Sequence, residues 1–578
     1  MRCRGLGLLL CTWIAGYVCL AAVKLPEPPP EPKLSSLHPF TGQRGTVMSA
    51  VLRGSGLQTA TGVYTGHKGF TIEIEGSEAE PPALTNTKNN AKNQVPIDLV
   101  RVRVRIAADA KPGWHLFRLI TPRGLSNALP IYVSDQPVIA EPEGTHETPE
   151  TAAALQPVPA LLTGRLGQRG EVDYFTFDAA AGQTLTFEGI SGLPSLGGPG
   201  GNANGFDPAL SIYQPVGSWF DAKRVKRIAF NDEPLWVIGD LTNAHLVHTF
   251  ETGGRYFLRV EAFSGQGGPD YSYQLKIRSG AVPPEPAPKT NAWDERAFER
   301  RLSASRLNEL AERGGTAKDQ KTAETYRGSA DGTVVKLPAT VEGALLAPGE
   351  THRAHFEIDS PQDIAFEVET PQTAPPLFNP IVRLLNAAGE EVATNVMAGR
   401  GACSGAMYKS IEAKTVVPLR NLGQYTVEVR ETTSDLAEPG FRYRVMIRPQ
   451  VPHIGDVKIE EDRVNLTPGD ARTVRVMFDR EENYRGAVVV MAESLPPGVE
   501  AAAGADFEPD KDPPANPGKR ERYTPRTERS VVVLTAAADA APMRQPQIAR
   551  LVVRPVVDGK PGVVVATKEI PVMIVSKP

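Results

Sequence analysis

Beyond its first 22 residues this chain has almost no cysteine. Cys3, Cys11 and Cys19 lie within that leading stretch, and only Cys403 follows it. A single cysteine cannot form a disulfide within a chain, so the domains must be stabilised by apolar cores alone.

The chain also lacks a basic excess and a second long apolar run. Its formal net charge is -4, so it has no surplus of cations to neutralise phosphates, and nucleic acid is not expected as a partner. After residue 22 no apolar stretch is long enough to cross a bilayer. We therefore expect no transmembrane segment once the leading stretch is removed.

Catalytic motifs are absent as well. The chain contains no G-x-S-x-G and no H-E-x-x-H. Residues 401–405 (GACSG) fit G-x-C-x-G around Cys403, but no β-α alternation surrounds them, as a nucleophile elbow requires. The glycine-rich stretch 197–201 lacks the Lys and Ser/Thr of a phosphate loop. We predict no catalytic residue and no enzymatic activity.

Two histidine pairs could suggest a metalloprotease. His245 and His248, like His352 and His355, are three residues apart. Residues three apart on a strand face opposite sides, so neither pair can hold one metal ion. We expect surface histidines.

Glycine and proline are abundant, at 53 and 52 of 578 residues. This composition favours turns and linkers over long helices, and the length favours three to five domains. Residues 1–22 have the form of a secretion signal, with Arg2 and Arg4 before an apolar run and small residues at 21–22. A retained membrane anchor is the alternative. Residues 23–33 form a proline-rich spacer. The expected location is secreted, periplasmic or cell envelope.

Residues 34–135 are predicted to form a β-sandwich, with strands at 47–52, 70–74, 99–106 and 114–120. The stretch 99–106 (LVRVRVRI) alternates, which places valines inward and Arg101, Arg103 and Arg105 outward. The arginine row could bind an anion, but a solvated face is the better interpretation. The segments HPFTGQRGTVMSAVLRGSGL and 122–127 (PRGLSN) resemble the immunoglobulin-like TIG family, which implies an immunoglobulin-like fold.

Residues 136–280 show the same alternation between turn residues. The motifs 170–175 (GEVDYF), 206–210 (FDPAL), 231–232 (ND) and 254–260 (GRYFLRV) occur in that order. They resemble the bacterial pre-peptidase C-terminal family. The resemblance implies a β-sandwich appended to exported proteins, acting as a binding or maturation module and not as an enzyme.

Residues 281–336 combine a proline-rich linker with an amphipathic helix over 291–314, capped by Asn291 and ended by Gly314. We expect this helix to pack between neighbouring sandwiches; binding of a partner is the alternative. Residues 337–449 are a second, diverged copy of 136–280, because Gly164 and Gly343, like Phe177 and Phe356, are 179 residues apart.

Residues 450–578 resemble immunoglobulin-like folds, with a polar insertion at 505–529 that we expect to be a mobile loop. The predicted fold class is all-β: a multi-domain string of antiparallel β-sandwiches, immunoglobulin-like and jelly-roll-like, with one linker helix.

Calcium is the candidate cofactor. Oxygen donors occupy expected loop positions of the first copy, and hard cations prefer such donors: Asp173, Asp207, Asn231, Asp232 and Asp240. In the second copy the matching residues are His352, Asn379, Asn395 and Val396, so any such site should exist only in the first copy. The alternative is that these are turn residues that cap their own backbone.

A ligand platform is the other candidate site. Trp219, Phe220 and Trp236 lie beside charged residues in expected loops and could contact a carbohydrate or a protein. The alternative is that they cover the edge of the sandwich.

The sequence therefore predicts a non-catalytic exported protein that binds an extracellular or envelope protein or polysaccharide through its loops. An exported peptidase, or an accessory protein of one, with an unrecognised site is the competing hypothesis. A mechanical spacer is a third.

Overall fold

The computed structural model describes residues 31–66, 68–80, 96–155, 157–192, 207–216, 224–232, 243–282, 306–315, 323–370, 380–400, 407–411, 414–432, 441–505 and 526–577. Of these residues 61% are in β-strands and 2% are in the one helix. The expected all-β, multi-domain string of sandwiches is confirmed. The predicted signal, most of the predicted proline-rich spacer and most of the predicted polar insertion lie outside the described residues.

The first sandwich pairs a sheet of order β1-β3-β6-β5 with one of order β2-β9-β7-β4, to which β8 adds. Its strands are β1 (Lys33–His38), β2 (Thr41–Gln43), β3 (Val47–Ser55), β4 (Gly62–Thr65), β5 (Phe70–Ala79), β6 (Asp98–Ile106), β7 (Gly113–Thr121), β8 (Gly124–Leu125) and β9 (Leu129–Ser134). The four strands predicted here are all present.

Strand β6 shows how the alternating sequence produces this sheet. Its valines are buried in the core, while its arginines face outward. Each arginine pairs with a glutamate of the neighbouring strand β5: Arg101 with Glu78, Arg103 with Glu75 and Arg105 with Glu73. The row is therefore a solvated ion-pair ladder, which favours the interpretation made from the sequence over an anion site.

The second sandwich has sheets of order β10-β12-β19-β14-β17 and β11-β13-β18-β15-β16. Its strands are β10 (Val138–Ala140), β11 (Ala153–Ala154), β12 (Ala160–Arg165), β13 (Val172–Ala179), β14 (Thr184–Ser191), β15 (Pro208–Pro215), β16 (Val225–Asn231), β17 (Asn243–Thr249), β18 (Gly254–Ala262) and β19 (Ser272–Ser279).

The third sandwich repeats this topology strand for strand, with orders β20-β22-β31-β24-β29 and β21-β23-β30-β25-β26, and adds a β27-β28 hairpin. The predicted second copy is thus a copy in topology also. Its strands are β20 (Glu324–Arg327), β21 (Thr333–Val334), β22 (Ala339–Ala344), β23 (Thr351–Ile358), β24 (Gln362–Glu369), β25 (Pro380–Leu385), β26 (Glu391–Thr394), β27 (Val396–Arg400), β28 (Met407–Ile411), β29 (Lys414–Leu419), β30 (Gly423–Glu431) and β31 (Arg442–Pro449).

The fourth sandwich has sheets of order β32-β34-β38-β36 and β33-β41-β39-β35-β37, with β40 paired to β39. Its strands are β32 (His453–Ile459), β33 (Val464–Leu466), β34 (Ala471–Glu481), β35 (Val488–Glu493), β36 (Val499–Ala502), β37 (Gly504–Ala505), β38 (Arg526–Ala536), β39 (Gln547–Val557), β40 (Lys560–Pro561) and β41 (Ala566–Ile574).

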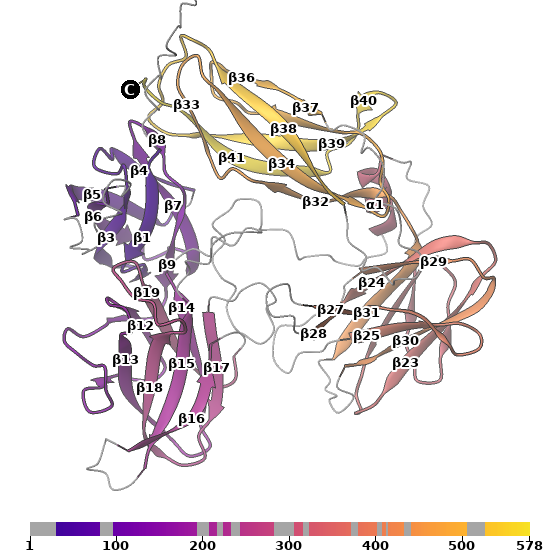
Figure 1. The fold of residues 1–578 in the computed structure, drawn as a ribbon, viewed down its shortest axis with the longest axis horizontal. Helices are drawn as coiled ribbons and strands as arrows, with labels where there is room; N and C mark the ends of the chain where they lie inside the picture. Colours follow the sequence, from indigo (N-terminus) through magenta and orange to yellow (C-terminus); the bar gives the residue numbers. More distant parts are fainter. Residues whose placement is uncertain are drawn as a thin grey trace, which may run out of the picture.

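The four sandwiches form an arch whose order in space differs from their order in the chain (Figure 1). The second and third sandwiches are its two feet, and the first and fourth meet at its top. Among the described residues, three interfaces hold the arch together: second with first, first with fourth, and fourth with third.

The interface between the first and second sandwiches is polar. Ser36 and Arg53 both donate to the carboxylate of Asp270. Further along, the Nζ of Lys276 donates to the Oη of Tyr132 at 3.1 Å. Both of these last two side chains are largely buried between the two sandwiches.

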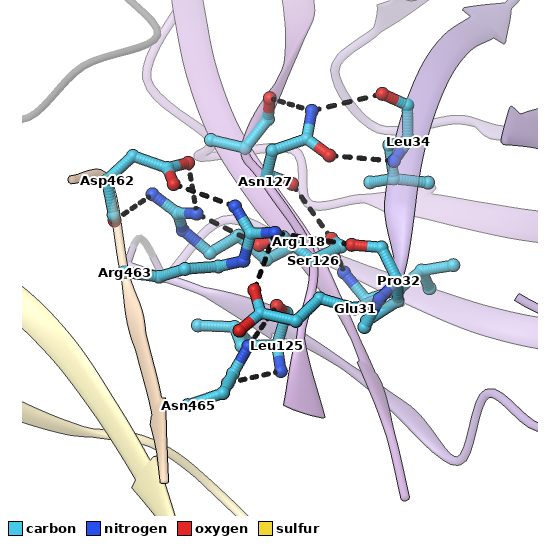
Figure 2. A network of polar contacts seen from close by, with 12 residues as sticks. Glu31, Pro32, Leu34, Arg118, Leu125, Ser126, Asn127, Asp462, Arg463 and Asn465 are labelled. Atoms are coloured by element: carbon cyan, nitrogen blue, oxygen red, sulfur yellow. Dashed lines mark hydrogen bonds and ion pairs between the residues drawn. The ribbon is translucent and has the colours of Figure 1, made fainter. Parts of the chain in front are cut away.

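The interface between the first and fourth sandwiches joins residues more than 300 positions apart (Figure 2). Arg118 donates to the Oδ2 and to the backbone oxygen of Asp462, each at 2.8 Å. Asn465 accepts from the N–H of Leu125 at 2.8 Å and donates to its C=O at 3.0 Å, as a neighbouring strand would. Gly124 permits this approach, because a Cβ there would lie 2.4 Å from the Asn465 side chain.

The interface between the third and fourth sandwiches is built on a buried ion pair. The guanidinium of Arg448, which is fully buried, donates to both carboxylate oxygens of Glu482 at 2.8 and 2.6 Å. Lys414 contacts Glu481 and Glu482 at 2.5 and 2.9 Å. Burial alone would raise the pKa of Glu482, but the hydrogen bonds and charge of Arg448 lower it strongly, so this carboxylate stays ionised.

Helix α1 (Arg306–Arg313) is the described part of the predicted helix, and it ends before Gly314 as expected. Leu307 and Leu310 pack on Met446 of the third sandwich. Arg313 donates to backbone oxygens of the fourth sandwich, including those of Ile454 and Val565. The expectation that this helix packs between neighbouring sandwiches is confirmed. No helix among the described residues is long and apolar enough to cross a membrane.

Candidate metal centre in the second sandwich

Three metal-ligating side chains meet at one end of the second sandwich. Glu141 and His146 lie in the segment after β10, and Asp173 lies near the start of β13. One potential ligand atom from each lies within 4.8 Å of the others. Two of the three, His146 and Asp173, are buried.

Asp173 faces the core because of its place in the alternation of β13. It shares the inward side of the strand with Phe175 and Phe177, while the residues between them are more exposed. The hydroxyl of Tyr273, from the opposite sheet, donates to its Oδ2 at 2.6 Å. Gly164 leaves room for the phenol, since a Cβ there would lie 2.5 Å from the Tyr273 ring.

This environment favours the protonated form of Asp173. Burial, reinforced by the negative charge of Glu141, raises the pKa of Asp173 to about 9. Without a cation nearby, Asp173 therefore carries a proton at neutral pH.

Backbone hydrogen bonds hold the other two ligands in place. The N–H of Glu141 donates to the oxygen of Thr163 at 3.0 Å, and the N–H of Arg165 donates to the Oε2 of Glu141 at 2.7 Å. The backbone oxygen of His146 accepts from the N–H of Tyr174 at 2.7 Å. The segment after β10 is thus fixed against β12 and β13 before any ligand binds.

The imidazole of His146 presents one nitrogen to the carboxylates. Its Nδ1 lies 3.2 Å from the backbone oxygen of Gly144, an acceptor, so Nδ1 carries a proton. Its Nε2 lies 2.8 Å from Glu141 and 3.5 Å from Asp173. Nε2 therefore faces an oxygen of each acidic side chain, the arrangement in which a metal ion could be shared among the three groups. A metal-ligating histidine typically uses its other N–H as His146 does here.

The donor set fits a divalent transition metal ion better than calcium. Calcium prefers oxygen ligands alone, whereas zinc accepts an imidazole nitrogen together with carboxylate oxygens. Glu141, His146 and Asp173 would hold such an ion, and the ion would supply the charge that otherwise requires protons. The expected calcium remains a prediction.

The structure does not bring together the four described donors of the five predicted from the sequence. Asp173, Val260, Leu210 and Asn231 lie in one row across four neighbouring strands. Three strand spacings separate Asp173 from Asn231, roughly 14 Å. One ion cannot contact both, because β18 and β15 lie between them.

The other predicted donors are placed as follows. Asn231 accepts a hydrogen bond from the N–H of His245 at 2.9 Å, so its side chain caps the backbone. Asp207 directly precedes β15, and its backbone oxygen accepts from the N–H of Phe263. Asp232 is half-buried after β16. Asp240 lies outside the described residues, as do Trp219, Phe220 and Trp236 of the ligand platform and Cys403.

The expectation of surface histidines is wrong for two of the four. His245 and His352 are buried, at 5% and 6% exposure. His245 contacts the backbone oxygen of Val282 at 2.8 Å. A hydrogen-bond partner for a ring nitrogen, Val282 for His245 and Tyr443 for His352, favours these interior positions, which the i, i+3 spacing cannot reveal.

The third sandwich has lost the metal-ligand set. His352 occupies the position of Asp173, and by strand register Gly328 occupies that of Glu141. His352 instead contacts Tyr443 and Glu350, each at 2.8 Å.

Glu141, His146 and Tyr273 were missed from the sequence. An acidic residue at an inward position of an alternating strand was the available signal, because a buried carboxylate needs partners. Identifying those partners required the fold, since they lie 27 to 100 positions from Asp173 along the chain.

Comparison of the sequence with protein-family models found no match, and neither did comparison with curated protein sequences. Among solved structures, the chain resembles the pre-peptidase C-terminal domain of a collagenase from Bacillus anthracis at 13% identity and a TM-score of 0.15, covering 25% of this chain and all of that one.

It also resembles a Salmonella alpha-2-macroglobulin reacted with methylamine, at 10% identity and a TM-score of 0.13, and domains 1-6 of the surface layer protein SbsC, at 9% and 0.15. These matches cover 92% and 95% of this chain. The chain spans only 32% of the macroglobulin and 55% of the surface layer protein.

Proposed function

We propose that this protein is a non-catalytic exported scaffold that binds a protein or polysaccharide of the envelope or extracellular space. Its sandwiches act as one preorganised arch. Export is inferred from the signal-like residues 1–22, and the binding role from the resemblance of residues 136–280 to the pre-peptidase C-terminal family.

The observation that carries this proposal is the contact between the first and fourth sandwiches. Arg118, Leu125, Asp462 and Asn465 form buried or half-buried hydrogen bonds between the two ends of the chain. Each such bond contributes about 0.5–1.5 kcal/mol, and one to a charged group somewhat more. Domains joined only by linkers would move independently, whereas an arch closed in this way holds its surfaces at fixed positions, which lowers the entropic cost of binding.

A metal ion bound in the second sandwich would make the arch more rigid. An ion on Glu141, His146 and Asp173 would fasten the segment that enters the second sandwich to its core. A thermal melt with zinc, with calcium and with chelator tests this. A midpoint raised by an ion supports the site and identifies the metal class, and identical midpoints in all three conditions would contradict it.

The described residues give little support to the competing hypothesis of an exported peptidase. His38 and Ser272 form a hydroxyl–imidazole pair at 2.9 Å. Ser272 is 1% exposed, and no carboxylate among the described residues hydrogen-bonds to His38. Burial lowers the pKa of His38 to about 4. The pair is an interdomain contact, because a catalytic serine must be reachable by substrate.

Two assays on the purified mature chain test the proposal. We expect retention on an envelope fraction from the producing organism, with no hydrolysis of casein or gelatin. Hydrolysis that is lost on a single Ser, Cys or Asp substitution would overturn the proposal. Absence of retention would contradict the binding role.

A further inference from the structure

A cleft of about 500 Å³ lies where the first and second sandwiches meet. Its walls come from β7 and β9 and the turn after β9 on one side, and from β12 and β19 on the other. Small-molecule sites have volumes in this range and often lie between domains.

The first sandwich supplies an aromatic wall. Trp114 and Tyr132 are direct cross-strand neighbours, and their rings meet edge to face with centroids 5.0 Å apart. Phe40, which is fully buried, stacks on the indole at 5.9 Å. One face of the indole is therefore covered, and Trp114, which is half-buried, presents its remaining surface to the cleft.

The second sandwich supplies a cationic wall, and the turn after β9 adds polar groups. Lys276 and Arg278 point from β19 to the cleft side of the sheet, where Arg278 pairs with Glu188 at 2.7 Å. Asp135 and Gln136 are exposed at the rim. The cleft thus combines aromatic surface with hydrogen-bond donors and acceptors.

In the third sandwich, the surface that corresponds to this cleft is covered by other parts of the chain. By register, Met446 and Arg448 occupy the positions of Lys276 and Arg278. There, α1 covers Met446, and Arg448 donates to Glu482 of the fourth sandwich as well as to Glu367 of its own sandwich. The equivalent surface of the second sandwich has no such helix among the described residues and is left as a cleft.

We propose that this cleft binds a saccharide, with a sugar ring against Trp114 and hydroxyl groups hydrogen-bonded to Asp135 and Gln136. The inference deepens the proposed binding function and rests on it. An apolar peptide helix, the occupant in the third sandwich, fits less well, because a lysine stands where the methionine is. A sugar offers C–H groups to an aromatic ring and hydroxyls to charged and amide side chains, and the two walls present both.

The test is affinity electrophoresis of the mature chain through native gels containing dextran, laminarin, xylan or polygalacturonate. We expect retardation in at least one gel, with an apparent Kd weakened about tenfold by the Asp135→Ala/Gln136→Ala double variant, as loss of one or two hydrogen bonds implies. Arg101→Ala, an exposed change on the same sandwich, is the matched control and should leave retardation unchanged.

Trp114→Leu should abolish retardation, but its contact with Phe40 makes a folding defect conceivable. The rim double variant keeps the test decisive, since both of its side chains are exposed and its melting midpoint should match that of the parent. An apparent Kd that is unchanged in the rim variant would overturn the inference, as would no retardation with any of the four polysaccharides. Capture of an envelope protein without any retardation would leave the proposed function standing and refute the saccharide.

Discussion

Replacing Asp173 by asparagine should stabilise the metal-free protein at neutral pH. The buried carboxyl must take up a proton on folding, because its pKa rises from an ordinary 3.8 to about 9. Asparagine has the same shape and needs no proton. Its amide oxygen can still accept from the hydroxyl of Tyr273, which now lies 2.6 Å from Oδ2.

The sign and size follow from proton linkage. The folded state binds a proton that the unfolded state has released between about pH 4 and pH 9, so wild-type stability falls as pH rises through this window. At pH 7, about three pH units above 3.8, the cost is on the order of 4 kcal/mol. Exchanging the acid O–H for an amide N–H changes the local hydrogen bonds by about 1 kcal/mol, so the expected net gain is about 3 kcal/mol.

Calorimetry in chelator at pH 5, 7 and 8.5 measures this effect. The midpoint of Asp173→Asn should exceed that of wild type by a margin that grows with pH. Asp178→Asn, on the same strand but exposed and 3.7 Å from Arg255, is the matched control and should change stability by less than about 0.5 kcal/mol. A margin that shrinks with pH, or a variant less stable than wild type at pH 8.5, would refute the assigned protonation state.

Two further changes probe the interfaces. Arg448→Met removes one of two cations from the buried carboxylate of Glu482, beside Lys414, and should destabilise the protein by about 3 kcal/mol in urea unfolding. Arg444→Met, at a side chain 40% exposed, should cost less than about 1 kcal/mol. Equal losses would contradict the buried pair. Gly124→Ala should lower the melting midpoint more than Gly144→Ala, because both glycines have positive φ but only Gly124 lies against another side chain, that of Asn465; equal midpoints would contradict the close contact.

Local patterns in the sequence predicted the strands and the repeat well. Strand β6 follows from alternation, because a period of two places Val100 and Val104 on one face. The third sandwich follows from the spacing of Gly343 and Phe356 relative to the second. These features depend on neighbours in the chain, so the sequence alone reveals them.

Contacts between distant residues could not be predicted in this way. Nothing near Asn465 indicates that it hydrogen-bonds to Leu125, 340 positions away. The partners of Asp173 come from two other segments of the second sandwich, and the donors chosen in their place, such as Asn231, lie at the ends of strands that are not adjacent to β13. The predicted string of sandwiches was therefore correct in its parts, while its closure into an arch required the structure.

Small-angle X-ray scattering of the purified mature chain tests the closed arch most directly. The account predicts a curve that fits the arch of Figure 1, and a larger radius of gyration for the Arg118→Ala/Asn465→Ala double variant, which removes the hydrogen bonds of Figure 2. An extended wild-type particle whose radius of gyration the double variant leaves unchanged would contradict it.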